Sequence, residues 1–321
     1  MTMERQKMQN ARYGVSEKGS YRSMLARDFR KNRLIYLMAL PVLAYYIIFQ
    51  YGPMYGLTIA FKDFSPAKGI LGSPWVGFQW FQEFFNSYYF ERLLKNTLLI
   101  NIFSLIFSFP APIILALLLN ELRKERFKRT VQTITYMPHF ISLVVICGMI
   151  HDFTARDGII NDLVVLLGGK RSTMLLEPQL FKPIYIISGI WQGIGWGSII
   201  YLAALSGIDP ELYQASVIDG ANRWNQIWHI TLPGILPTIV ILLIMRIGSM
   251  MSVGHEKIIL LYNPSTYETA DVISSFVYRK GLLEANYSYS SAVGLFNSII
   301  NLILVIAANW FSRKATETSL W

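Results

Sequence analysis

Residues Gln214–Pro233 read QASVIDGANRWNQIWHITLP and lie between two long apolar runs of the chain. The tripeptide Asp-Pro-Glu at 209–211 comes just before them and is typical of a helix start. Its Asp caps the first turn, its Pro suits a position with no hydrogen bond to donate, and its Glu complements the helix dipole. We therefore expect a helix over Glu211–Trp228 that Pro233 ends before the next apolar run.

The composition around this stretch is that of a membrane protein. Of the 321 residues, 53% are hydrophobic and 15% are charged, whereas soluble domains carry roughly 25% charged residues. The single cysteine, Cys147, excludes an internal disulfide framework and is expected to be a packing residue. The net charge of +9 does not indicate nucleic acid, because nine Lys and Arg precede Leu34 and flank the first apolar run.

Six apolar segments are long enough to cross roughly 30 Å of hydrocarbon. The sequence therefore predicts an all-α polytopic membrane protein with six transmembrane helices, and places the helix of the Gln214–Pro233 loop between the fourth and fifth. We read the first segment as a retained anchor, because no small-residue cleavage site follows it. The predicted spans are Leu34–Tyr51, Asn96–Leu119, Val131–Ile150, Ile184–Ser206, Gly234–Val253 and Ser290–Phe311.

The distribution of positive charge predicts the orientation. With the N-terminus inside, 17 of the 29 Lys and Arg fall in inner segments, 11 fall in outer loops, and Arg246 lies within a span. Inner segments carry the excess of Lys and Arg in membrane proteins, so both termini are expected in the cytoplasm. The outer loop 52–95 holds an aromatic cluster, which indicates either an interfacial helix or a docking surface for an external protein.

The loop at 214–233 has a fixed spacing: Gln214-Ala215-Ser216, three residues, Gly220, nine residues, then Ile230, one residue and Leu232-Pro233. This spacing resembles the EAA loop of bacterial importer permeases, which docks in a cleft of an ATP-binding subunit. Gln replaces the acidic residue of that pattern and Ser replaces its second Ala, so a hydrogen bond rather than an ion pair is expected from position 214. The coupling residues that the resemblance implies are Gln214, Ala215, Ser216, Asp219, Gly220, Ile230, Leu232 and Pro233.

Segments on both sides of the loop extend the resemblance. Residues 60–63 (AFKD), 69–75 (GILGSPW), 260–264 (LLYNP) and 267–272 (YETADV) are similar to polysaccharide or complex-oligosaccharide permeases of Gram-positive bacteria, in the maltose-permease-related branch. The resemblance implies four parts. They are a basic cytoplasmic tail (1–33), a first transmembrane helix with an extracellular loop (34–95), a MetI-like permease core (96–311) and a cytoplasmic C-terminal tail (312–321).

The implied function is that of a permease subunit in an ATP-driven ABC importer, which passes an oligosaccharide or polysaccharide fragment into the cytoplasm by alternating access. The implied partners are a second homologous permease, two ATP-binding subunits and an extracellular solute-binding lipoprotein, assembled in the bacterial cell membrane. The chain itself is expected to hold no cofactor. The stretch Gly168–Arg171 lacks the hydroxyl and upstream glycine of a phosphate-binding loop, so ATP and Mg belong to the partner ATPase.

Six residues are candidates for the substrate pathway. Arg246 is a charge inside a span, so it is expected either to pair within the bundle or to meet an anionic sugar such as a uronate. Trp191, Gln192 and Trp196 suit sugar binding, although Trp near the end of a span is also typical of interfacial anchoring. Asn101 and Asn297, like Asn301, are expected either to join helices or to line the cavity.

Two rival functions stay open at the level of the sequence. A secondary transporter or channel not coupled to ATP would show inverted repeats and no ATPase-docking loop. A membrane-bound enzyme would need a catalytic constellation, and no catalytic or metal-binding motif is apparent: the histidines His139, His151 and His229 are scattered. His255 and Glu256 close the fifth predicted span, but a proton relay is not needed where ATP supplies the driving force.

Overall fold

The computed structural model describes residues 28–316 and 319. Regular structure in this part of the chain is helical, apart from one isolated bridge between Lys62 and Trp75. Among the described residues, five helices are long and apolar enough to cross a membrane, or up to six if one bent pair counts as a single span. The chain divides into two units, residues 1–58 and 59–321.

The first unit contains the first predicted span. Helix α3 (Arg33–Tyr45) passes through a π-helical segment (Tyr46–Tyr51) into α4 (Gly52–Met54), and the candidate membrane helix extends over Arg33–Phe61. A helix that is apolar on all sides is typical of a membrane span. Most of the basic tail expected at 1–33 lies outside the described residues.

The second unit is built around four long helices, which confirm four further predicted spans with shifted ends. They contact one another in the pairs α8–α12, α12–α15 and α15–α19. The four are α7 (Tyr89–Phe103) continued by a π-helical segment (Ser104–Ser108) and α8 (Pro110–Glu121); α12 (Pro178–Ser206); α14 (Arg223–Gln226) continued by a π-helical segment (Ile227–Thr231) and α15 (Leu232–Gly248); and α19 (Tyr287–Thr316).

The third predicted span, Val131–Ile150, is not a continuous helix. Helix α9 (Glu125–Tyr136) runs through a 3-10 turn (Met137–Phe140), and then the axis bends by 103° into α10 (Leu143–Thr154) and α11 (Ile159–Leu166). Pro138 interrupts the hydrogen-bond ladder here, and Ser142 starts the new helix by accepting a bond from the Val145 N–H at 3.4 Å.

The loop helix expected over Glu211–Trp228 is also divided. Helix α13 (Pro210–Ile218) ends before Gly220, whose φ of +77° favours glycine, and α14 begins after Asn222. The Asn222 side chain accepts a bond from the Asn225 N–H at 2.9 Å and caps the second helix.

Pro233 does not end this element, contrary to the prediction. It directly follows the π-helical segment and Leu232, and the helix continues through it, so the loop helix runs directly into the fifth span over Arg223–Gly248. The span also ends at Gly248 rather than Val253, and α19 continues past Phe311 to Thr316.

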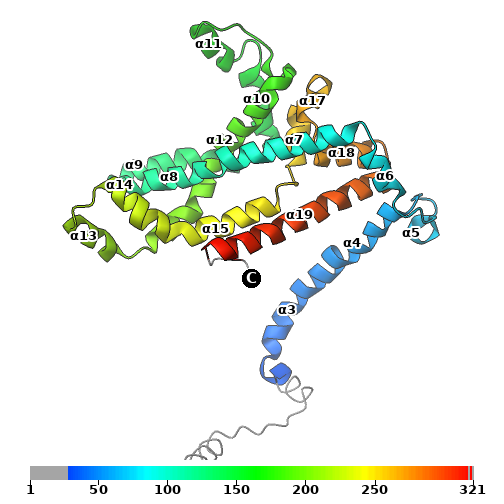
Figure 1. Cartoon of the computed structure of the whole chain (residues 1–321), viewed down its shortest axis with the longest axis horizontal. Helices are drawn as coiled ribbons and strands as arrows, with labels where there is room; N and C mark the ends of the chain where they lie inside the picture. The colour runs from blue at the N-terminus through cyan, green and yellow to red at the C-terminus, as the bar shows by residue number, and fades with distance from the viewer. Residues whose placement is uncertain (1–27, 317–318, 320–321) are drawn as a thin grey trace, which may run out of the picture. The chain divides into compact units, whose positions relative to one another are not determined.

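Short helices cover the end of this unit opposite α13 (Figure 1). The outer loop forms α5 (Gly69–Gly72) and α6 (Gln79–Phe85), and the fifth and sixth spans are joined by α16 (His255–Leu261), α17 (Tyr267–Ala270) and α18 (Ile273–Tyr278). In α6, Phe81 and Phe84 are buried against α19, so part of the aromatic cluster is core, whereas Trp75 and Phe78 are exposed.

Close packing fixes the bent helix against α12. A Cβ at Gly195 would lie 2.1 Å from the Thr135 carbonyl oxygen, so only glycine lets α12 and α9 approach this closely. Further along, Ile113, Tyr201 and Ile235 form a buried cluster where α8, α12 and α15 meet. The long helices therefore form one packed bundle that holds the loop helices at one end.

Candidate coupling surface and substrate cavity

The candidate coupling surface is the elbow formed by α13, the Gly220 turn and α14. The Asp209 carboxylate accepts a bond from the Glu211 N–H at 2.9 Å and caps α13, as the sequence predicts. Ser216 accepts a bond from the Gln226 side chain at 2.9 Å, and Tyr213 bonds Thr231 through their hydroxyls at 3.0 Å. These two contacts tie α13 to the start of the fifth span.

An ion pair ties the same elbow to the second span. The Arg223 guanidinium donates to the Glu121 carboxylate at the end of α8. The elbow is thus attached to both α8 and the helix that continues into α15.

The eight sequence-predicted coupling residues divide into two groups. Those on α13 and its turn form an exposed surface, with Ser216 half-buried; the others lie on the π-helical segment and α15 and position the elbow. Val217 and Ile218 are 64% and 87% exposed beside them, and Trp224 is 71% exposed. Large apolar side chains exposed at a loop are typical of a surface that another protein covers. The surface group is Gln214, Ala215, Ser216, Asp219 and Gly220, and the second group is Ile230, Leu232 and Pro233.

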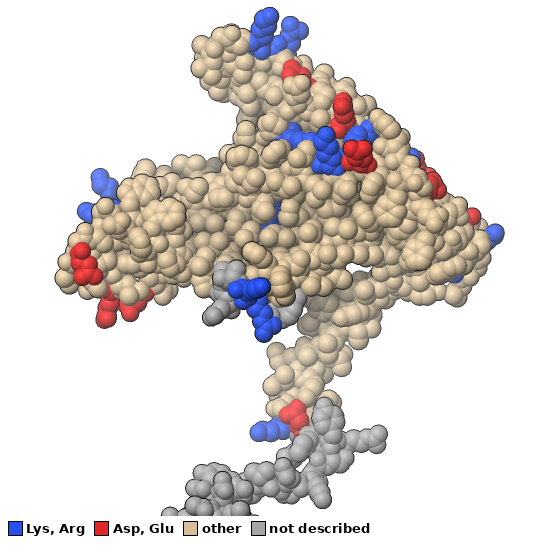
Figure 2. Space-filling view, viewed as in Figure 1, with Lys and Arg blue, Asp and Glu red and all other residues tan. Residues whose placement is uncertain are grey.

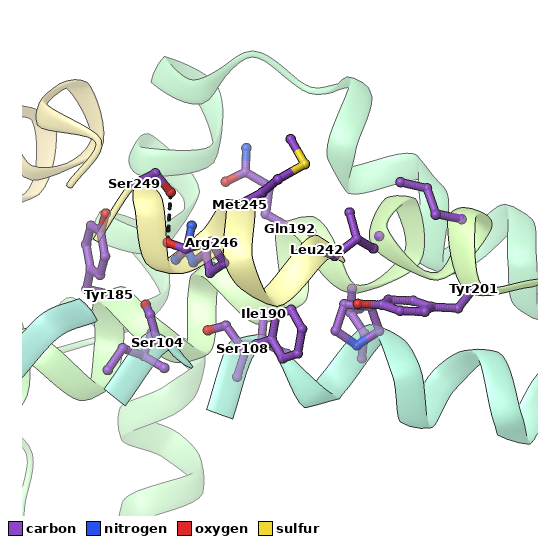
Figure 3. A pocket seen from close by; sticks show the side chains of 18 of the residues that line it. Ser104, Ser108, Tyr185, Ile190, Gln192, Tyr201, Leu242, Met245, Arg246 and Ser249 are labelled. Carbon is purple, nitrogen blue, oxygen red and sulfur yellow. Dashed lines mark hydrogen bonds between the residues drawn. The ribbon is translucent and has the colours of Figure 1, made fainter. Parts of the chain in front are cut away.

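The candidate substrate cavity has a volume of about 680 Å³ and lies between the second, fourth and fifth spans. Figure 3 shows Arg246 on α15 opposite Ser104 and Ser108 of the π-helical segment, with Gln192 and Tyr185 contributed by α12. π-helical segments are frequent at functional sites. None of the described residues that line the cavity is acidic.

Two cations line this cavity. Arg246 lies in the last turn of α15, and Lys257 reaches the cavity from α16. The Lys257 side chain donates to the Tyr185 carbonyl at 3.3 Å and lies 5.1 Å from the centroid of the Tyr185 ring. Burial lowers the pKa of the Lys257 ammonium to about 8. At neutral pH the cavity therefore carries two positive charges.

The cavity collects two of the six predicted pathway residues, Arg246 and Gln192. Trp191 is 40% exposed, and Trp196 stacks on His139 with ring centroids 4.5 Å apart; neither lines the cavity. The role of each in transport remains a prediction.

The asparagines lie elsewhere. Asn101 is buried and donates to the Thr97 carbonyl of its own helix at 2.7 Å. Asn297 lines a separate cavity between α18 and α19. Asn301 accepts a bond from the Met251 N–H at 2.8 Å and donates to Ser252 at 2.8 Å, so it joins α19 to the segment after α15.

Sequence reasoning missed Lys257, Tyr185, Ser104 and Ser108. Lys257 follows the fifth span in a polar segment, where nothing in the pattern separates it from a solvent-exposed lysine. Tyr185 could have been found from its spacing, because it lies seven residues before the candidate Gln192 and residues seven apart share a helix face.

A bundle of long apolar helices joined by loops is the architecture of a polytopic membrane protein. Residues 108–317 match the family described as the binding-protein-dependent transport system inner membrane component, and the chain belongs to this family. This confirms the family resemblance found in the loop and its flanking segments. The chain is therefore a multi-pass inner membrane component of a transporter.

Individual relatives match over nearly the whole chain. Protein LplB of Bacillus subtilis (strain 168) is 44% identical over 293 residues, which cover 91% of this chain and 92% of the relative. The polygalacturonan/rhamnogalacturonan transport system permease protein YteP of the same strain is 45% identical over 292 residues, 91% of each chain. A chain from the crystal structure of a bacterial alginate ABC transporter, in complex with an alginate pentasaccharide-bound periplasmic protein, has a TM-score of 0.85 and 44% identity, over 92% of this chain and 99% of that chain.

Proposed function

We propose that this chain is the permease subunit of an ATP-driven importer for acidic oligosaccharides or polysaccharide fragments. The observation that carries the acidic cargo is the pair of cations, Arg246 and Lys257, in a cavity with no acidic residue among the described residues that line it. A charge in a membrane bundle is costly unless it meets a partner, and a uronate carboxylate is a suitable one. The relatives support the class: one is named for polygalacturonan and another for alginate.

The cavity has the chemistry to hold a uronate residue. Arg246 offers a planar fork that matches a carboxylate, and Lys257 adds a compact positive charge. The hydroxyls of Ser104 and Ser108 and the amide of Gln192 are placed to bond sugar hydroxyls.

Coupling to ATP is proposed to pass through α13. In this proposal the exposed surface of α13 docks in a cleft of an ATP-binding subunit, and two such subunits supply ATP and Mg. When they close on ATP, the elbow moves as a lever attached to α8 and α15, and the bundle switches between outward and inward access by rigid-body motion. A second homologous permease completes the pathway, and an extracellular solute-binding lipoprotein delivers the cargo. Both termini then lie in the cytoplasm.

The test is uptake by the whole complex, reconstituted in liposomes with its binding protein. We expect a galacturonate trisaccharide to accumulate only with hydrolysable ATP at the coupling face, and to be taken up in preference to its carboxyl-reduced, neutral counterpart. A non-hydrolysable ATP analogue serves as the control. Uptake that needs no ATP would establish the rival secondary transporter or channel, and equal uptake of both sugars would contradict an acidic cargo.

A further inference from the structure

A second cavity of about 650 Å³ lies at the end of the bundle opposite α13, between the start of α7, α12 and α17. We infer that it is an entry subsite, which binds a uronate residue of the cargo before that residue reaches the central cavity. The inference rests on the proposed function for the class of cargo. Three cations line the cavity: Arg92 and Lys95 on α7 and Lys182 on α12.

Lys182 is held in place by an amide rather than by a carboxylate. Its ammonium donates to the side-chain oxygen of Asn96 at 3.0 Å. Asn96 is buried and fixed in turn, because its NH₂ group donates to the Glu268 carbonyl at 2.8 Å and to the Asp271 carbonyl at 3.1 Å. Within residues 28–316, neither Lys95 nor Lys182 forms an ion pair. Both lysines keep donors for a ligand.

Arg92 carries surplus positive charge for a different reason. The fully buried carboxylate of Asp271 faces two guanidiniums, Arg279 at 2.6 Å and Arg92 at 3.5 Å, and also accepts a bond from Ser275 at 2.8 Å. Burial acts to lower the pKa of Arg279, but the contacts with Asp271 raise it overall, so the Arg279 guanidinium keeps its charge beside Asp271. The closer pair satisfies Asp271, which leaves the charge of Arg92 available at the cavity.

The other lining residues fit a sugar rather than a bare anion. Tyr88 is 85% exposed and Phe85 is 46% exposed, which gives aromatic faces for the apolar face of a sugar ring. Glu91 and Glu268 also line the cavity and can accept bonds from sugar hydroxyls. Figure 2 shows charged side chains of both signs gathered over α7, α17 and α18. The cations of the cavity suit the carboxylate of a uronate, and its two glutamates suit the hydroxyls of the same sugar. The lining therefore favours a uronate.

The two cavities share helix faces. On α12, Lys182 lines the entry cavity, and Tyr185, Gly189 and Gln192 line the central one. Their spacing of three, four and three residues places them on one face, and the ten steps from 182 to 192 correspond to about 15 Å along the helix. A glycan following this face passes from the three entry cations to Lys257 and Arg246.

The test uses the whole reconstituted transporter with the double variant Lys95→Gln and Lys182→Gln. Glutamine keeps a donor for Asn96 but removes the charge. We expect KM for the galacturonate trisaccharide to rise about fivefold to tenfold, with kcat within about twofold of the wild-type value. The reason is that the substitutions weaken binding of the cargo before the transporter closes around it. KM for the carboxyl-reduced trisaccharide should stay unchanged. Lys170→Gln, an exposed lysine outside both cavities, is the matched control.

The charge-keeping variant, Lys95→Arg with Lys182→Arg, should restore the KM of the wild-type chain. An unchanged KM for the acidic sugar in the Gln variant overturns the entry subsite. So does an equal rise for both sugars that the Arg variant does not restore, because that result indicates a structural role. If the wild-type transporter shows no preference for the acidic sugar, the proposed cargo fails instead, and that measurement is made first.

Discussion

Lys257 is a buried cation whose charge depends on pH near the physiological range. It is 8% exposed, and burial lowers the pKa of its ammonium to about 8. The groups around it are the carbonyl and ring of Tyr185, the thiol of Cys147 on α10, and Arg246 across the cavity. Because the folded pKa lies below the ordinary lysine value, the positive charge is present below pH 8 and is lost as the pH rises through it.

We therefore predict that the cavity binds acidic cargo more weakly at alkaline pH. Between pH 7 and pH 9, KM for the galacturonate trisaccharide should rise severalfold, and KM for its neutral counterpart should not. The variant Lys257→Arg should remove this pH dependence, since arginine stays charged throughout. Cys147→Ser is the control for the neighbouring thiol. The same pH profile in the wild-type chain and in Lys257→Arg would show that Lys257 is not the titrating group.

At the residue scale, the sequence located one of the two cavity cations. Arg246 stood out because a charge inside an apolar run needs a partner or a cavity. Lys257 did not, because its burial comes from the return of α16 against α10 and α12, a long-range packing that no local pattern carries. Trp196 does not line the central cavity, and its ring stacks on His139, so its role in transport stays a prediction.

Among the elements, the elbow at α13 and α14 shows what spacing predicts and what it leaves out. The spacing identified the loop and its family, and Asp209 caps α13 as expected. It did not predict that the second half of the loop is the beginning of the fifth span. That outcome depends on Gly220, whose positive φ turns the chain, and on the π-helical segment Ile227–Thr231, after which the helix continues through Pro233.

The contact between Glu121 and Arg223 yields a prediction at this scale. If it carries motion from α13 to α8, then Arg223→Glu should lower cargo-stimulated ATP hydrolysis by about twofold to fivefold, while the melting temperature changes little, because an exposed ion pair contributes at most about 1 kcal/mol. The double variant Glu121→Arg with Arg223→Glu restores the pair and should recover most of the stimulation.

The matched control for this experiment is Arg129→Glu. It breaks the exposed pair of Glu125 and Arg129 on α9, which lies within one helix and links no second element. Equal losses in the Arg129 and Arg223 variants, or no recovery in the double swap, would show that charge at this face matters but the particular contact does not.

On the scale of the whole molecule, apolar length predicted most of the spans well, because crossing the membrane constrains composition strongly. The third span was predicted as continuous, yet it bends by 103° between Phe140 and Leu143, just after the turn that contains Pro138. Pro is tolerated in membrane helices, so its presence did not decide between a kink and a break. The entry cavity was not predicted, since it joins residues from α7, α12 and α17 that are far apart in sequence.

The expected orientation has a direct check. In a Cys147→Ser background, Lys170→Cys should react with a membrane-impermeant maleimide on intact cells, and Lys124→Cys should react only after the cells are opened. Both lysines are exposed, one before α12 and one before α9. The reverse pattern would place α13 outside the cell and would exclude its proposed contact with an ATP-binding subunit.

The most direct measurement is the uptake of acidic against neutral trisaccharide by the reconstituted transporter carrying Arg246→Met, with the exposed Arg156→Met as control. If acidic cargo crosses the central cavity, KM for the galacturonate trisaccharide should rise about tenfold or more, equivalent to roughly 1.4 kcal/mol of lost binding, while the neutral sugar changes by less than about twofold. The KM of Arg246→Lys for the galacturonate trisaccharide should lie between the wild-type value and the value of Arg246→Met. An equal loss for both sugars would contradict this role and would leave Arg246 as a structural residue of the bundle.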